Sequence, residues 1–411
     1  MRLKLHLSPP ATKLLKSNIR ITGSKSESNR LLLLQALYPN IGIDNLSNSD
    51  DAQVMQKGLN TSKGVVDIHH AGTAMRFLTG YFASQEGKEV LLTGSRRMTE
   101  RPIKVLVDAL HKLGAEIAYE KNDGYPPIRI KGKKLTRNKV SLPANISSQY
   151  ISALLLVAPG LGNGLELDLK GEITSVPYIK MTLALLEQIG VRTTFEGNKI
   201  KVYPEESVNS KTLVVESDWS SASYFYSIVA LSTVGSEVIL SSYKKNSLQG
   251  DSVLAGIYKN WGVDTDFREN EISLRKVADL KPENLNLELS NAPDTAQTIA
   301  VTCFGLGVGC HLTGLHTLKI KETDRLVALD TELSKLGADI IVSDKDLILR
   351  PSYQMNKDVA IDTYNDHRMA MAFAPLAMKT SIYVNDAEVV SKSYPDFWKD
   401  LEILGLTIRK S

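Results

Sequence analysis

Six short polar segments are positioned to do chemistry, because each directly precedes a stretch of small and apolar residues typical of a buried helix. The first turn of such a helix exposes unpaired N–H groups and the positive end of the helix dipole, which together favour anions. Ser, Thr, Asn and Asp also cap helices, so capping alone could explain any single segment. The segments begin at Ser24, Ala71, Ser147, Asp218, Asp294 and Asp366.

Cations within these segments are not explained by capping. Lys25 and Arg30 flank the first expected helix start, Arg76 lies inside AGTAMRFL, and Arg368 precedes MAMAF. Burying an unpaired Arg or Lys is costly. Each buried cation therefore predicts a carboxylate or phosphate partner, either within the chain or on a bound molecule.

Other cations lie close to carboxylates. Arg101 and Arg325 stand just before two helices of similar sequence, and this repetition favours a shared anion site over two unrelated ion pairs. The segment KIKETDR (319–325) has three cations and two carboxylates before an apolar helix, although a solvated charged turn would look the same. Asp294 precedes a long uncharged run and is expected to be either a cap or a base whose pKa burial raises.

An internal repeat accounts for the recurrence of these segments. After a first interval of 47 residues, successive segments start 71 to 76 residues apart. Glycines that follow expected helix ends and precede expected strands form a second series with intervals of 68 to 76 residues, and Gly58 is expected to be a displaced further member. The two series predict six copies of one α/β unit. The glycines are Gly114, Gly190, Gly262, Gly337 and Gly405.

Composition narrows the class of protein. A chain of 411 residues with 43% hydrophobic and 23% charged residues predicts a globular protein of two or three domains. The net charge of +3 gives no broad basic field, so no nucleic-acid partner is expected. The apolar runs are too short to span a membrane and the N-terminus does not resemble a signal peptide, so we expect no membrane association and a cytoplasmic location.

No metal site or nucleotide cofactor is predicted. Cys303 and Cys310 lie in an apolar, Gly-rich run without metal-ligand spacing, and we expect them to be buried thiols. The segment from Gly23 lacks the earlier glycine of a phosphate-binding loop, and the glycines at 305–309 lack the spacing of a dinucleotide site. His70 and His367 could transfer protons, although a structural role is expected for each.

Nine motifs, in order within a matching stretch from residue 21 to residue 398, give the chain its resemblance to a known family. It resembles the 5-enolpyruvylshikimate-3-phosphate synthases (3-phosphoshikimate 1-carboxyvinyltransferases) of the enolpyruvyl transferase family. The motifs are GSKSESNR (23–30), AGTAMR (71–76), RMTERPI (97–103), SSQY (147–150), SVPYIK (175–180), SSASYF (220–225), KETDRL (321–326), YNDHRMAM (364–371) and SKSYPDFW (391–398).

The resemblance implies an α/β fold of two lobes, each with three copies of a βαβαββ unit, and an active site in the cleft between the lobes. The chain would cross between the lobes twice. The N-terminal lobe is expected at 22–216, and the discontinuous C-terminal lobe at 1–21 and 217–411.

The resemblance also implies a reaction. The enolpyruvyl group of phosphoenolpyruvate would be transferred to the 5-hydroxyl of shikimate 3-phosphate through a tetrahedral intermediate, with release of phosphate. This step belongs to the shikimate pathway, which leads to chorismate and the aromatic amino acids. The two small substrates are the only expected partners, no cofactor or metal is expected, and the chain is expected to be a monomer.

Residue roles follow from the resemblance position by position. Asp294 would be the base for the 5-hydroxyl, Glu322 would exchange the proton at C3, and Lys25 would join them in catalysis. Phosphoenolpyruvate would be held by Lys25, Gly72, Arg101, Gln149, Arg325, Arg368 and Lys392. Shikimate 3-phosphate would be held by Ser26, Arg30, Ser147, Ser148, Gln149, Ser175, Asp294, Thr317 and Lys321.

Three positions depart from the usual family pattern, and two other functions stay open. His70 and Thr317 stand where Asn is usual, and Phe77 stands where Pro is frequent. The first alternative is transfer of enolpyruvyl to UDP-N-acetylglucosamine, although the segment RRMTER (96–101) lacks the reactive Cys or Asp of that sister enzyme. The second is a non-catalytic repeat protein that binds anions, against which the carboxylates of Asp294 and Glu322 argue.

Overall fold

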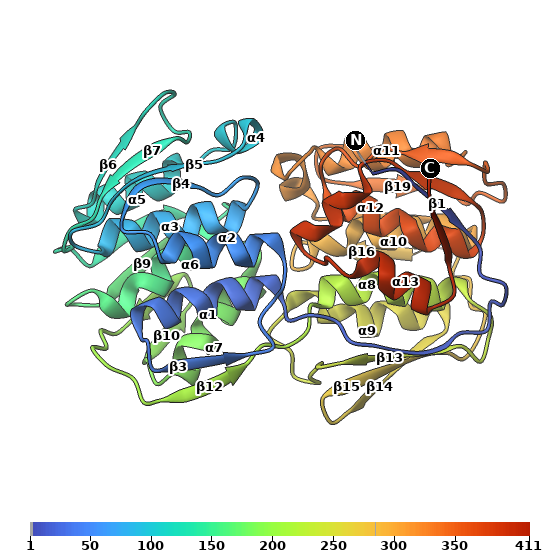
Figure 1. Cartoon of the computed structure of the whole chain (residues 1–411), viewed down its shortest axis with the longest axis horizontal. Coiled ribbons are helices and arrows are strands. Elements are labelled where there is room, and N and C mark those ends of the chain that lie inside the picture. Colours follow the sequence, from blue (N-terminus) through green and yellow to red (C-terminus); the bar gives the residue numbers. More distant parts are fainter. Residues whose placement is uncertain (1–2, 284) are drawn as a thin grey trace. The chain divides into compact units, whose positions relative to one another are not determined.

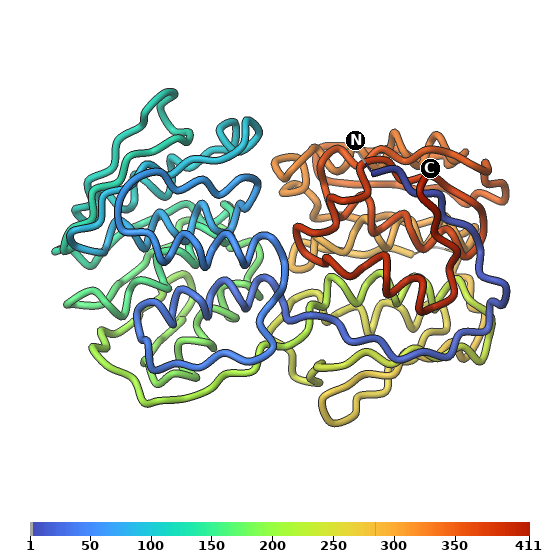
Figure 2. The backbone as a smooth tube through the Cα atoms, in the orientation of Figure 1, coloured from blue at the N-terminus to red at the C-terminus, as the bar shows by residue number. Residues whose placement is uncertain are grey.

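The computed structural model describes residues 3–283 and 285–411, and the chain forms two compact units (Figure 1). The continuous unit is Gly23–Val215, and the discontinuous unit joins Met1–Thr22 to Glu216–Ser411. Near the two ends of the chain, β1 (Leu5–Ser8) pairs with β22 (Thr407–Lys410) inside the discontinuous unit (Figure 2). No helix in the described ranges is long and apolar enough to cross a membrane.

Two four-stranded sheets of the continuous unit share one pairing pattern, in which a parallel pair is followed by two antiparallel pairs. Each sheet alternates with two helices along the chain, which gives a βαβαββ copy. The first copy consists of β4 (Lys63–Asp67), α3 (Gly72–Ser84), β5 (Glu89–Thr93), α5 (Lys104–Leu113), β6 (Glu116–Tyr119) and β7 (Ile128–Lys131), with the short α4 (Arg96–Thr99) inserted. The second consists of β8 (Lys139–Pro143), α6 (Ser148–Val157), β9 (Leu165–Lys170), α7 (Val176–Gln188), β10 (Thr193–Glu196) and β11 (Lys199–Val202).

The discontinuous unit repeats this pattern in three sheets. One contains β2 (Lys16–Ile19), α8 (Trp219–Leu231), β13 (Glu237–Ser241), α9 (Leu254–Ile257), β14 (Val263–Arg268) and β15 (Glu271–Lys276). The next contains β16 (Leu285–Glu288), α10 (Ala296–Leu306), β17 (Cys310–Thr313), α11 (Arg325–Lys335), β18 (Ile340–Val342) and β19 (Leu347–Leu349). The last contains β20 (Val359–Ile361), α12 (His367–Phe373), β21 (Ile382–Val384), α13 (Phe397–Ile403), β22 and β1.

The remaining copy, in the continuous unit, is reduced to two strands, which explains the short first interval of the sequence repeat. It consists of α1 (Lys25–Leu37), β3 (Ile41–Asp44), α2 (Asp50–Leu59) and the parallel partner of β3, β12 (Lys211–Val214). Gly58 lies inside α2, whose C-cap is Asn60, so its predicted place in the glycine series is wrong. A Cβ at Gly58 would lie 2.4 Å from Leu78 Cδ1, so close helix packing accounts for the glycine.

The six predicted helix starts are confirmed. Ser24, Ser147, Asp218 and Asp366 each accept a hydrogen bond from a backbone N–H in the first turn of the helix that follows. Ala71 precedes α3 without a side-chain cap. Asp294 lies in a single 3-10 turn, Pro293–Thr295, directly before α10.

The helices that follow these starts are buried nearly all round, as their composition predicts. In α8, every residue except Ser220 is buried, and hydroxyl pairs satisfy its polar side chains against α10. Ser223 pairs with Thr298 at 3.0 Å, and Thr302 donates to Ser227 at 2.7 Å. Because the bodies of these helices are packed away, their first turns are the parts left to contact a ligand.

The five predicted glycines all have positive φ, which confirms them as helix-ending residues. Gly262 ends the 3-10 turn Tyr258–Trp261 with φ 70°, and a Cβ there would lie 2.0 Å from Ala278 O. Gly405 has φ 91°, but a Cβ there would meet only Pro10 Cβ, at 3.8 Å. Gly262 is therefore required both by its left-handed backbone and by the close contact with Ala278, whereas Gly405 is required by its backbone conformation alone.

We expect Gly262→Ala to lower the free energy of unfolding by about 3 kcal/mol, because a left-handed alanine and a steric clash both destabilise the fold. The matched variant Gly405→Ala should cost about 1 kcal/mol, from the backbone conformation alone. Urea unfolding of the two variants measures the difference. Equal losses would mean that the contact with Ala278 does not constrain the turn.

Candidate functional site

In the continuous unit, the start of α1 brings Lys25 to an acidic neighbour. Lys25 Nζ lies 3.4 Å from Asp51 Oδ2, and both side chains are largely buried, at 17% and 10% exposure. Ser26 follows in the same helical turn and is partly exposed. The predicted ligand Lys25 thus already has an internal carboxylate partner, with which an incoming anion would compete.

Arg30, one turn further along α1, is held by neutral oxygen atoms. Its guanidinium donates to Thr182 Oγ1 at 2.8 Å, Ser26 O at 2.8 Å and Ser152 Oγ at 3.1 Å. Burial lowers the pKa of Arg30 to about 10, although the nearby Tyr178 and Glu27 act in the opposite direction. Arg30 therefore ties α1 to α6 and α7 and orients the first turn that carries Ser26.

Phe77, one of the departures from the family pattern, supports Arg30. The Arg30 guanidinium carbon lies 5.3 Å from the centre of the Phe77 ring, and Phe77 is fully buried. The aromatic face adds a favourable cation–π contact to a charge that has few carboxylates nearby.

Arg101 lies against the start of α3. A Cβ at Gly72 would lie 2.7 Å from Arg101 Nη1, so a side chain here would displace the guanidinium from its present place at this helix end. Arg101 Nε is buried and has no hydrogen-bond partner within the described residues. This cation, the side-chain-free start of α3 and its N–H groups form a suitable site for an anion.

The segment that carries Arg101 is anchored by Arg76 and Tyr150. Arg76 donates to Gly72 O at 3.2 Å and to Pro102 O at 3.0 Å, and the Tyr150 hydroxyl donates to Pro102 O at 2.5 Å. These acceptors of Arg76 are neutral carbonyl oxygens, a kind of partner that the sequence prediction did not consider. They fix the backbone next to Arg101.

The starts of α6 and α7 add polar groups to the same unit. Ser147 caps α6, and Gln149 Nε2 donates to Thr73 Oγ1 at 3.1 Å, which links α6 to the start of α3. Ser175 precedes α7 with φ 55°, a left-handed conformation that is uncommon for serine. In the part of the chain that the structure describes, the buried Ser148 and Ser175 side chains have no hydrogen-bond partner, so both hydroxyls are available to a ligand.

In the discontinuous unit, Asp294 is surrounded by three cations. Its carboxylate lies 2.7 Å from Arg325 Nη1, 3.3 Å from Lys321 Nζ and 3.3 Å from Arg368 Nη2. Burial alone would raise the pKa of Asp294, but Arg368, Lys321 and Arg325 outweigh it and hold this pKa well below its usual range. The expected raised pKa is therefore wrong, because the sequence did not show how many cations converge on this carboxylate.

Arg325 is the most buried of these cations, with 2% exposure of its side chain. It pairs with Asp366 through Nε at 2.6 Å and with Glu322 through Nη2 at 3.0 Å, in addition to Asp294. Burial lowers the pKa of Arg325, but the three carboxylates outweigh this effect and raise the pKa above its ordinary value.

The predicted equivalence of Arg101 and Arg325 is not observed. Arg325 is the first residue of α11, whereas Arg101 precedes α5 by three residues. Arg325 makes three ion pairs, and Arg101 makes none within the described ranges. Arg101 thus has donors to offer to a ligand, whereas Arg325 mainly holds the carboxylates in place.

The remaining predicted residues of this unit lie around the same group. Burial and the nearby Arg325 and Arg368 lower the pKa of Lys321, although Asp294 and Glu322 oppose this. Lys392 Nζ donates to the backbone oxygen of Asn365. Thr317 Oγ1 is buried in the turn His316–Ile320 and has no hydrogen-bond partner among the described residues.

A loop held by a buried carboxylate presents Asp366 to Arg325. Tyr364 and Asn365 both have positive φ, 53° and 54°, directly before the helix start at Asp366. Glu332 Oε1 accepts from the Tyr364 hydroxyl at 2.6 Å, and the side chain of Glu332 is fully buried. Two successive left-handed residues are unfavourable without such support.

Sequence reasoning missed the structural roles of four carboxylates: Asp51, Glu332, Asp366 and the buried Asp251, which accepts a hydrogen bond from the Ser220 hydroxyl. Asp366 was expected only as the start of a helix segment, and the other three carry no local pattern. The burial of Asp51 beside Lys25 and of Glu332 beneath Tyr364 depends on contacts between segments far apart in the sequence. Of the signals available, only the motif YNDHRMAM marked one of them.

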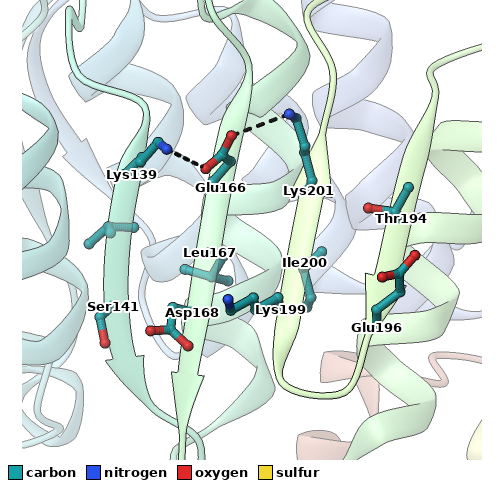
Figure 3. A pocket seen from close by; sticks show the side chains of 11 residues that line it. Lys139, Ser141, Glu166, Leu167, Asp168, Thr194, Glu196, Lys199, Ile200 and Lys201 are labelled. Carbon is teal, nitrogen blue, oxygen red and sulfur yellow. Dashed lines mark ion pairs between the residues drawn. The ribbon is translucent and has the colours of Figure 1, made fainter.

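A cavity of about 540 Å³ on the sheet of β8, β9, β11 and β10 contains none of the predicted site residues (Figure 3). Glu166 accepts from Lys139 at 2.8 Å and from Lys201 at 3.2 Å across neighbouring strands. These charges pair with one another on an exposed strand face. In the described residues, no group of three or more His, Cys, Asp or Glu side chains could hold a metal ion.

In this repeated α/β fold, cations and carboxylates lie together at the starts of helices. Such an arrangement is typical of proteins that bind small polyanions and can transfer protons. The sequence model of the family EPSP synthase (3-phosphoshikimate 1-carboxyvinyltransferase) matches residues 39–401. The chain belongs to this family.

Individual relatives agree with this assignment. The chain is 45% identical over 409 residues to a 3-phosphoshikimate 1-carboxyvinyltransferase of Bacteroides fragilis, covering 98% of each chain. It is 37% identical to the protein of that name from Shewanella pealeana, covering 98% of this chain and 99% of that one. A solved structure of EPSP synthase from Acinetobacter baumannii has the same fold, with a TM-score of 0.82, 22% identity and full coverage of both chains.

We expect Asp294→Asn to bind inorganic phosphate about 10-fold more tightly than the unmodified chain. The substitution removes a carboxylate that competes with an incoming anion for Arg368, Lys321 and Arg325. Isothermal titration calorimetry measures the affinity. The control Asp344→Asn removes an exposed carboxylate that pairs with Lys319 and should leave phosphate affinity unchanged. Weaker binding by Asp294→Asn would contradict the assignment of these cations to an anion site.

Proposed function

We propose that this chain is an enzyme that transfers the enolpyruvyl group of phosphoenolpyruvate to the 5-hydroxyl of shikimate 3-phosphate and releases phosphate. This is the activity for which its relatives are named. The observation that carries the proposal is the convergence of Asp294 and Glu322 on Arg325, with Lys321 and Arg368 beside Asp294. Such a group combines acid–base residues with cations that stabilise developing negative charge.

The substrates suit the residues of both units. Each substrate has a phosphate and a carboxylate, so together they need several cations and N–H donors. We assign phosphoenolpyruvate to Lys25, Gly72, Arg101, Gln149, Arg325, Arg368 and Lys392. We assign shikimate 3-phosphate to Ser26, Arg30, Ser147, Ser148, Gln149, Ser175, Asp294, Thr317 and Lys321. In this assignment Arg30 acts by orienting Ser26, and Thr317 uses its unpartnered hydroxyl in place of the usual Asn.

The chemistry then divides between the two carboxylates. The 5-hydroxyl oxygen attacks C2 of phosphoenolpyruvate while its proton passes to Asp294, and Glu322 delivers a proton to C3. In the resulting tetrahedral intermediate, C2 carries both the shikimate oxygen and the phosphate. Glu322 then removes a proton from C3, the C2–C3 double bond re-forms, and phosphate leaves with the proton that Asp294 took from the 5-hydroxyl, so both carboxyl groups return to their starting states.

Substrate binding must also raise the pKa of Asp294. Without substrate, the three cations keep the pKa of Asp294 low, and a carboxylate with so low a pKa is a weak base. The phosphate and carboxylate groups of the substrates neutralise part of this positive charge, which raises the pKa of Asp294 toward a useful value. Turnover should therefore depend on both anions being bound together.

We further propose that lobes at 22–216 and at 1–21 with 217–411 serve one reaction. We propose that the chain works as a cytoplasmic monomer without cofactor or metal. Sedimentation in the presence of both substrates tests the monomer, and activity after dialysis against a chelator tests the absence of a metal requirement.

The direct test is phosphate release from phosphoenolpyruvate with two alternative acceptors. We expect turnover with shikimate 3-phosphate and none with UDP-N-acetylglucosamine, because the RRMTER segment lacks the reactive Cys or Asp of the sister enzyme. Turnover only with the sugar nucleotide would assign the chain to that enzyme. Phosphate-analogue binding without turnover of either acceptor would support a binding protein instead.

Glu322→Gln should reduce kcat about 100-fold or more while leaving the affinity for shikimate 3-phosphate within about 2-fold, because amide and carboxylate have the same shape but only the acid can transfer a proton. Steady-state kinetics and calorimetry give the two values. The control Glu271→Gln removes a surface partner of Arg268 and should not change either value. Near-normal turnover of Glu322→Gln would remove this residue from the mechanism.

A further inference from the structure

A buried carboxylate outside the predicted site lies close to Arg368. Asp251 occupies the 3-10 turn Gly250–Val253, directly before α9, and is 3% exposed. Its Oδ2 accepts from the Ser220 hydroxyl, whereas its Oδ1 is buried and has no hydrogen-bond partner in the described residues. Burying a carboxylate that is only half satisfied is costly, so its retention calls for a purpose beyond folding.

Ser220 connects Asp251 to the predicted anion site. It is the one residue of α8 that is not buried, and its Oγ lies 3.1 Å from Arg368 Nη2. A hydroxyl has one proton, so when Ser220 donates it to Asp251 the oxygen is left to accept from Arg368. The direction of both hydrogen bonds is thus set by the carboxylate.

The position of Asp251 is itself fixed by a neighbour. Gln249 Oε1 accepts from Trp219 N at 2.9 Å, and Gln249 Nε2 donates to Ser217 O at 2.9 Å. These bonds attach the turn that carries Asp251 to the start of α8, which carries Ser220.

We propose that Asp251 is a positioning residue, which acts through Ser220 to hold the Arg368 guanidinium in the orientation that receives the anionic group of phosphoenolpyruvate. Arg368 also contacts Asp294, where Nη1 lies 3.2 Å from Asp294 O and Nη2 lies 3.3 Å from Asp294 Oδ2. Ser220 attaches the guanidinium to a second residue, at 3.1 Å from Nη2. The identity of the anion rests on the proposed function, but the coupling of Asp251 to Arg368 does not.

The charges around Asp251 make this arrangement sensitive to pH. Burial chiefly, together with Asp294 and Asp218, raises the pKa of Asp251 to about 6, while Arg368 and the Ser220 hydroxyl oppose the rise. Below this pH the carboxyl group is neutral and can itself donate to Ser220. The Ser220 proton then faces the N–H of Arg368, and the attachment is lost. The KM for phosphoenolpyruvate should therefore increase as the pH falls through about 6.

The effect of Asp251→Asn on thermal stability distinguishes a positioning role of Asp251 from a purely structural one. The pKa of Asp251 is raised in the folded chain, so its ionised form opposes folding at every pH above the unfolded pKa. Asp251→Asn removes that opposition and should not lower Tm at pH 7.5. A carboxylate needed only for the fold would lower Tm when replaced.

The kinetic test compares Asp251→Asn, Ser220→Ala and the double variant. We expect each single variant to raise the KM for phosphoenolpyruvate about 10-fold, with kcat within about 2-fold and the KM for shikimate 3-phosphate unchanged. The double variant should be no worse than Ser220→Ala, because both act along one path. The rise in KM below pH 6 should disappear in Asp251→Asn. The surface control Asp339→Asn should match the unmodified chain. An unchanged KM in Asp251→Asn at every pH would overturn the proposal, as would a drop in Tm with a uniform loss of kcat.

A second measurement does not require turnover. Side-chain ¹⁵N resonances of Arg368, assigned with Arg368→Lys, report how slowly the guanidinium rotates. Rotation should accelerate in both Asp251→Ala and Ser220→Ala, and unchanged rotation would overturn the coupling. If the unmodified chain turns over no acceptor, the proposed function fails, and this measurement still decides the role of Asp251.

Discussion

A fully buried guanidinium must be paired, and in the discontinuous unit this requirement organises everything around Arg325. Its three carboxylate partners come from three segments: Asp294 from the turn before α10, Glu322 from the segment before α11, and Asp366 from the start of α12. Removing any one partner would leave the buried guanidinium with two of its three ion pairs and so with less compensation for its burial. The two copies that supply these segments are thereby locked in register, and Asp294 and Glu322 are held within reach of one guanidinium.

The continuous unit meets the same requirement in another way. Arg30 is as buried as Arg325, but the acceptors around it are hydroxyl and carbonyl oxygens, so burial lowers its pKa to about 10. Arg325, among carboxylates, has its pKa raised. The difference has a consequence for ligands. Arg30 and Arg101 make no ion pair among the described residues, although Glu27 lies near Arg30. An anion that binds these cations would therefore have a paired carboxylate to displace only at Lys25, beside Asp51.

The sequence predicted those features of the structure that depend on interactions between residues close together in the chain. Helix starts such as Ser147 and Asp366, and helix-ending glycines such as Gly405, depend on neighbours within a few residues. The same pattern recurs in several copies of the repeat, which made these positions predictable from the sequence. Gly58 failed because close packing against Leu78, rather than a local turn, requires it. Family resemblance supplied the reaction and the residue roles, which no periodicity contains.

Contacts between distant segments were beyond such reasoning. The direction of the pKa shift of Asp294 depends on Lys321, Arg325 and Arg368. These cations come from the segments around the starts of α11 and α12, so the residues near 294 in the sequence could not show how many cations surround this carboxylate. The turn that contains Asp251 likewise has no distinctive local sequence, and its link to Arg368 through Ser220 exists only in the folded chain.

Asp294 and Asp251 show how the pKa values of two carboxylates near the same cationic group can be shifted in opposite directions. Three cations lie within 3.3 Å of Asp294 and lower its pKa, whereas Asp251 is separated from Arg368 by Ser220, so burial dominates and raises its pKa to about 6. An anion that binds Arg368 would weaken the electrostatic effect of this cation on both Asp294 and Asp251. The pKa of Asp294 would rise toward that of a base, and the pKa of Asp251 would rise further. At neutral pH, however, Asp251 must stay ionised for Ser220 to keep accepting from Arg368. The distance that Ser220 puts between Asp251 and the guanidinium therefore limits how strongly the bound anion is felt there, while Asp294, in direct contact with the cations, receives most of the change.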